Sequence, residues 1–108
     1  MNWQDKFEAE IRRAEGARLG GNEGQARVCA RRAAGIVVAE HNARRGLMPQ
    51  SGSAVDLLLQ LLTDSGTPAD ALPLIDHLVQ QVSTEFALPA GVDLIADARH
   101  LRQLLLPD

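Results

Sequence analysis

The stretch "GNEGQARVCARRAAG", residues 21–35, decides the fold class because it joins a helix start to a run of small residues. Asn22 is a favourable amino-terminal cap, and from there the sequence keeps helical spacing as far as Gly46. This predicted helix is the longest in the chain. Its alanines indicate a seam along which another helix packs, whereas its arginines raise the alternative of a phosphate-binding strip.

The small residues of this helix share one face. Helical spacing aligns Ala26, Ala33 and Val37, with either Cys29 or Ala30 between them. Small side chains let a neighbouring backbone approach closely, so we expect this face to be a packing seam. The single cysteine, Cys29, cannot form an internal disulfide, and we expect it to be a small buried hydrophobic residue rather than a nucleophile.

The arginines of the same helix lie on another part of its surface. Arg27 and Arg31 stack one turn apart, with Arg32 beside them. The preceding turn, Gly20–Gly21, offers free amides close to a helix start, which makes these three arginines the candidate anion-binding residues. The segment lacks the lysine and the spacing of a P-loop, however, and Glu23 repels a phosphate there. We therefore favour a solvated helix face that is paired with nearby carboxylates.

A first helix precedes this one, and a short third helix follows it. Gly20–Gly21 stops the first helix, and Gly66 ends the third. The apolar face of the first helix is set by the helically spaced residues Trp3, Phe7, Ile11, Ala14 and Arg18. Ser53 and Asp56 resemble a capping box at the start of the third helix. The predicted core stripe of this short helix is Val55, Leu58, Leu59 and Leu62.

Two more helices complete the chain. The fourth begins at Thr67–Pro68 or at Asp70, and Pro73 is harmless just after Asp70 because amides in a first turn have no intrahelical partner. The predicted stripe of the fourth helix is Ile75, Leu78, Val79, Val82 and Phe86. The sequence "LPAG" then breaks the chain, and Pro107 ends the fifth helix. The inward residues of the fifth helix are expected to be Leu94, Ile95, Ala98, Leu101 and Leu105.

These segments predict an all-α protein with a single domain, residues 1–108. The expected architecture is an up-and-down four-helix bundle, with the short third helix as an additional piece in the long connection. No run of alternating β-branched residues in the sequence favours a sheet. A chain of 108 residues can bury one core without disulfides or a metal.

The charge of the chain is divided unevenly. The net charge is −3, but residues 1–50 carry +3 and residues 51–108 carry −6. Such opposite halves favour attraction of an anionic ligand to the first half or a head-to-tail meeting of two copies, although solvated helix faces explain the same pattern. The charged amino terminus and the short apolar runs predict a cytoplasmic protein that is not exported and does not span a membrane.

Three histidines on three predicted helices, His41, His77 and His100, are the remaining candidates for chemistry. No two of them have chelating spacing on one helix, so we expect no metal site and no cofactor. General acid-base catalysis needs a proton acceptor placed beside the nucleophile, and the sequence shows no such pairing. The sequence therefore predicts no catalytic residues and no enzyme.

The parts follow one another in a definite order. An amphipathic helix and a glycine turn precede the alanine-rich "ARVCARRAAGIVVAEHNARRG", and then come "VDLLLQLLTDSGTPADALPLIDHL" and "DLIADARHLRQLL". This order resembles the HEPN helical domain over nearly the whole chain. The resemblance implies a four-helix bundle that commonly dimerises and acts beside a partner such as a nucleotidyltransferase. Active members cleave RNA with an Arg and a His near the last helix, but "VSTEFALPAGVDL" contains neither, so no ribonuclease residues are carried over.

Two functions of different classes remain. The favoured one is a noncatalytic, HEPN-like interaction module that forms a homodimer, because the third and fifth helices carry more leucines than one core can hold. These surplus leucines are Leu57, Leu61, Leu104 and Leu106. The alternative is a HEPN-like nucleotide or RNA binder, with weak ribonuclease activity as a further option, that uses Arg27, Arg31 and Arg32 on the second helix. Nucleic acid is the less favoured partner.

Overall fold

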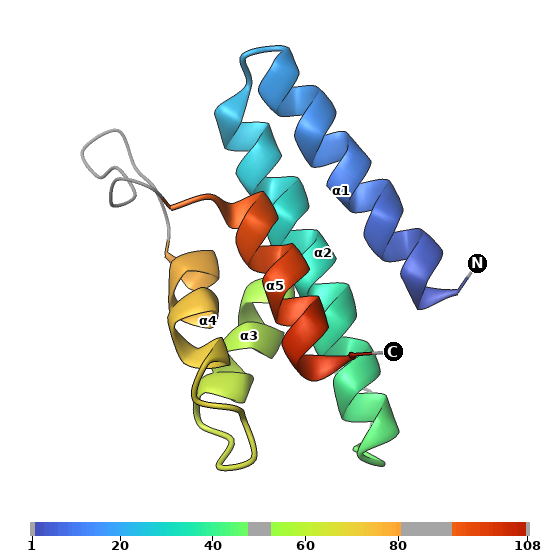
Figure 1. Ribbon diagram of the computed structural model, residues 1–108, viewed down its shortest axis with the longest axis vertical. Coiled ribbons are helices and arrows are strands. Elements are labelled where there is room, and N and C mark those ends of the chain that lie inside the picture. Colours follow the sequence, from blue (N-terminus) through green and yellow to red (C-terminus); the bar gives the residue numbers. More distant parts are fainter. Residues whose placement is uncertain (1, 48–52, 81–91, 108) are drawn as a thin grey trace.

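The computed structural model describes residues 2–47, 53–80 and 92–107, and these residues form five helices (Figure 1). The helices are α1 (Trp3–Leu19), α2 (Glu23–Arg44), α3 (Ala54–Leu62), α4 (Ala71–Val79) and α5 (Leu94–Leu105). No strand occurs in these ranges, which confirms the all-α prediction. None of the five helices is both long enough and apolar enough to cross a membrane.

A tight turn joins α1 to α2. Gly21 has a φ of +81°, a left-handed conformation that favours glycine, and its N–H donates to the carbonyl of Arg18 at 3.0 Å. The N–H of Asn22 donates to the carbonyl of Ala17 at 2.8 Å. Asn22 is also the predicted cap of α2, because its side chain accepts from the N–H of Gln25 at 3.1 Å. One asparagine therefore closes α1 and opens α2, and the two helices form an antiparallel hairpin (Figure 1).

The other helix ends follow local rules as well. The predicted capping box of α3 is confirmed, since Ser53 Oγ accepts from the N–H of Asp56 at 3.2 Å and Asp56 Oδ2 accepts from the N–H of Ser53 at 3.4 Å. Helix α2 ends at Arg44, two residues before Gly46, whose φ of +75° prevents further helix. Helix α4 begins directly after Asp70, whose side chain makes no capping hydrogen bond to the start of α4.

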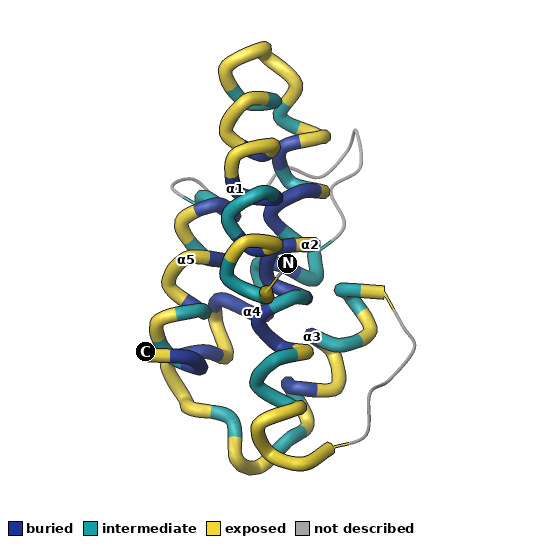
Figure 2. The backbone as a smooth tube through the Cα atoms, turned by 90° about the vertical axis from the view of Figure 1, so that its right-hand side faces the viewer, coloured by how far each residue is buried: buried dark blue, intermediate teal, exposed yellow. Residues whose placement is uncertain are grey.

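Helix α2 is the central element, because it contacts each of the other four described helices. These four surround it in the order α1, α5, α4 and α3, and Figure 2 shows α5 and α3 on opposite sides of the α1–α2 hairpin. Helix α1 contacts α5, α5 contacts α4, and α4 contacts α3, but no Cα atom in the described part of α3 lies within 8 Å of a Cα atom of α1. The ring of helices around α2 is therefore open at one joint.

The composition of α2 explains its central place. Its small residues allow several neighbours to approach its backbone, and the predicted packing seam is confirmed. The buried residues of α2 are Ala26, Cys29, Ala30, Ala33, Ala34, Gly35, Val37 and Val38. They extend well beyond the single face expected from the sequence, because the helix is covered from several sides. Cys29 is 1% exposed and behaves as the predicted buried hydrophobic residue.

The short helix α3 faces the core differently from the prediction. Leu58 and Leu61 are its buried residues, whereas Leu59, expected in the core stripe, is 45% exposed. The reason is the close contact of Ala54 with Gly35 of α2, which turns the face of residues 54, 58 and 61 inward. Val55 and Leu62 of the predicted stripe lie at the margin and are only partly buried.

The predicted stripes of the other helices agree better with the structure. All five inward residues expected on α5 are buried. On α4, Ile75 and Leu78 are buried, while Val82 and Phe86 lie outside the described residues. The surplus of leucines is smaller than expected, because two of the four supposed extra leucines, Leu61 and Leu106, are each 2% exposed and belong to the core.

Candidate functional site

The first candidate, Arg31, holds the end of α4. Its Nε donates to the carbonyl of Leu78 at 2.7 Å, and its Nη2 donates to the carbonyl of Gln80 at 2.5 Å. Carbonyls at the end of a helix have no intrahelical donor, so the guanidinium supplies one from α2. Burial and the neighbouring charge of Arg27 lower the pKa of Arg31. The hydrogen-bonding edge of Arg31 is thus occupied by protein.

The other two candidate arginines have different surroundings. Within the described residues, neither Arg27 nor Arg32 makes a hydrogen bond or an ion pair. Arg27 is close enough to Glu23 to lower the pKa of that carboxyl, although the hydrogen bond from Arg18 is the larger cause. Arg32 is exposed and lines a groove that is described below. The structure therefore gives the three predicted arginines three separate environments.

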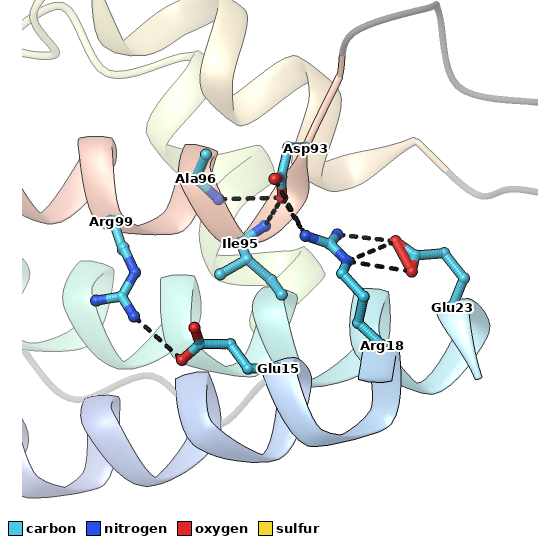
Figure 3. Close-up of polar contacts among 7 residues, drawn as sticks. All are labelled: Glu15, Arg18, Glu23, Asp93, Ile95, Ala96 and Arg99. Carbon is cyan, nitrogen blue, oxygen red and sulfur yellow. Dashed lines mark hydrogen bonds and ion pairs between the residues drawn. The ribbon is translucent and has the colours of Figure 1, made fainter. Parts of the chain in front are cut away.

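The helix ends near the hairpin turn are joined by Arg18 (Figure 3). Its Nη1 donates to Asp93 Oδ1 at 3.0 Å, and its Nη2 donates to Glu23 Oε1 at 2.8 Å. Asp93 is the cap of α5 and accepts from the N–H groups of Ile95 and Ala96. Burial raises the pKa of Asp93, but the hydrogen bonds from Ala96 and Arg18 outweigh burial and hold the pKa below its ordinary value. One guanidinium thereby connects α1, α2 and α5.

Further ion pairs continue along the border of α1 and α5, which we call the α1–α5 edge. Arg99 donates to Glu15 at 3.2 Å, and Arg102 donates to Glu8 at 3.1 Å. A pocket of about 350 Å³ lies beside Arg18 and Arg99. The charged groups that line this pocket already bind one another (Figure 3), so we assign it a structural role.

The open joint of the helix ring contains a groove of about 400 Å³. It is lined mainly by apolar or small residues of α2 and α3, together with two charged residues. The lining residues are Glu10, Arg32, Gly35, Ile36, Ala39, Ala54 and Leu57. At Gly35 the two helices are as close as they can be, because a Cβ atom there would lie 2.7 Å from the Cβ of Ala54. Glycine at this position therefore sets the wall of the groove.

Glu10 is the charged residue of the groove that the sequence interpretation missed. It is 8% exposed, and its Oε1 accepts from Arg13 Nη1. Its Oε2 is shielded from water and has no hydrogen-bond partner among the described residues. A buried acceptor without a donor costs free energy, so this oxygen requires a partner. A signal was present, since Glu10 lies next to Ile11 and one turn after Phe7, on the inner side of α1.

The three histidines do not form a site. His77 Nδ1 lies 3.1 Å from Asp97 Oδ2, and burial raises the pKa of Asp97 although His77 opposes this shift. His41 is partly buried, its Nε2 has no hydrogen-bond partner in the described ranges, and burial lowers its pKa. His100 is exposed. Among the residues that the structure describes, no group of three or more His, Cys, Asp and Glu side chains could hold a metal ion.

Comparison with known proteins identifies no relative. No family model matches the chain, and neither a curated protein nor a solved structure matches it significantly. The resemblance to the HEPN domain thus stays a prediction, and the candidate function depends on the geometry of this chain alone. That geometry singles out the groove, because Arg32 and one oxygen of Glu10 have no hydrogen-bond partner there among the described residues, while the charged groups of the α1–α5 edge bind one another.

Proposed function

We propose that the protein is a noncatalytic helical interaction module that works as a homodimer in the cytoplasm. Its architecture in this proposal is HEPN-like, with α1, α2, α4 and α5 as an up-and-down four-helix bundle and α3 as the additional piece. The observation that carries the proposal is the groove between α1 and α3, where the ring of helices around α2 is open. The partner covers this groove.

The lining of the groove supports a protein partner. Ile36 and Leu57 are only partly buried there, and Ala39 is exposed. Removing such apolar surface from water stabilises an assembly by roughly 25 cal/mol per Å². Leu57 is one of the surplus leucines, and Leu61, one turn further along α3, is already used by the core. Part of the remaining apolar surface of α3, at Ala54 and Leu57, therefore lines the groove, whereas the exposed Leu59 does not line it.

Sedimentation equilibrium at micromolar concentration tests the proposal. The wild-type chain is expected to have the mass of two chains, and Ala39→Arg is expected to give one, because the exposed Ala39 accepts a long charged side chain without disturbing the core. Ala96→Arg is the control, since Ala96 is an exposed helical alanine on α5. A monomeric wild type contradicts the homodimer and turns attention to a different protein for the same groove. A dimeric Ala39→Arg variant contradicts the location.

A second candidate function is supported by the unpaired arginines. Arg27 and Arg32 make no hydrogen bond in the described part of the chain, so both remain free to meet the phosphates of a nucleotide or an RNA. Titration with RNA and mononucleotides at increasing salt separates the two functions, because phosphate contacts lose affinity steeply with salt. Arg27→Gln weakens RNA binding in this alternative and leaves the homodimer unchanged, since Arg27 does not line the groove.

A further inference from the structure

We draw no further inference here: the strongest candidate, the groove between α1 and α3 at the open joint of the helix ring, carries nothing, because nothing in the structure shows what covers it.

Discussion

The α1–α5 edge and the α1–α3 groove are two borders of the same helix, and they are built in opposite ways. At the α1–α5 edge, Glu8 and Glu15 of α1 are paired with Arg102 and Arg99 of α5. At the groove, Glu10 keeps an oxygen without a donor among the described residues, and the backbones of α3 and α1 are more than 8 Å apart between Cα atoms. One border is closed by ion pairs within the chain, whereas the other leaves an acceptor without a donor among the described residues.

The two borders show how charged residues of the basic half and of the acidic half pair with one another. Arg18 of the basic half binds Asp93 of the acidic half, as the overall charge suggests. Glu15 and Arg99 bind with the signs reversed, an acid in the basic half and a base in the acidic half. The charges of the two halves are therefore partly paired inside one chain.

The largest expected effect comes from the wall of the groove. Gly35→Ala places a Cβ atom 2.7 Å from the Cβ and 3.0 Å from the Cα of Ala54, so α3 must move away from α2. Overpacking of this kind costs about 2 kcal/mol even after the gain in helix propensity. Urea unfolding is expected to show this loss, and the proposed homodimer is expected to weaken in sedimentation equilibrium because the groove changes shape.

Gly16→Ala is the matched control for this substitution. Gly16 lies within α1, and nothing is within 4 Å of the position that a Cβ would take. Replacing an exposed helical glycine by alanine stabilises a helix by up to about 1 kcal/mol. The two glycine substitutions are therefore expected to change the free energy of unfolding in opposite directions. A Gly35→Ala variant that is more stable than the wild type contradicts the close contact of α2 with α3.

The next effect compares two consecutive arginines on α2. Arg31→Met leaves the carbonyls of Leu78 and Gln80 without their donor, at a cost of about 1.5 kcal/mol. Arg32→Met is expected to change stability by less than about 0.5 kcal/mol, because Arg32 is exposed and makes no hydrogen bond among the described residues. Thermal unfolding of the two variants measures this difference. Equal losses of stability would contradict the conclusion that Arg31 holds the end of α4 while Arg32 makes no contact of this kind.

The fold features that could be predicted are those that depend on neighbours in the sequence. The caps at Asn22 and Ser53 and the glycine turn involve residues only a few positions apart, and helical spacing identifies most of the buried residues of α5. The orientation of α3 could not be predicted, because nine residues rich in leucine offer several apolar faces. Contact with Gly35 of another helix makes the choice.

The candidate site was harder to predict, because its partners are distant in the sequence. Arg31 and the carbonyl of Leu78 are 47 positions apart, and Arg18 and Asp93 are 75 positions apart. Helical spacing placed the arginines on the surface of α2 but gave no information on which helix lies beside each one. Glu10 was overlooked for the same reason, since only the position of α3 shows that it borders a groove.

A smaller effect depends on pH and concerns His41 near the end of α2. Burial, and then the charge of Arg45, lower the pKa of His41 in the folded chain below its ordinary value. The unfolded chain therefore takes up this proton first as pH falls, so stability from neutral His41 is complete above about pH 6.5 and decreases below it. His41→Gln is expected to remove this part of the loss between pH 7 and 5, which is about 1 kcal/mol or less.

The smallest effect tests what closes the α1–α5 edge. Arg99 and Arg102 both form ion pairs with α1, but Arg102 also lies 4.9 Å from the ring centres of Trp3 and Phe7. Exposed ion pairs contribute about 0.5 kcal/mol or less and are screened by salt, whereas a cation over an aromatic ring adds a contribution that salt affects less. Arg99→Gln is therefore expected to lower the free energy of unfolding only slightly, and not at all in 1 M salt. Arg102→Gln should cost more under both conditions, and equal losses for the two variants would show that charge alone holds this edge.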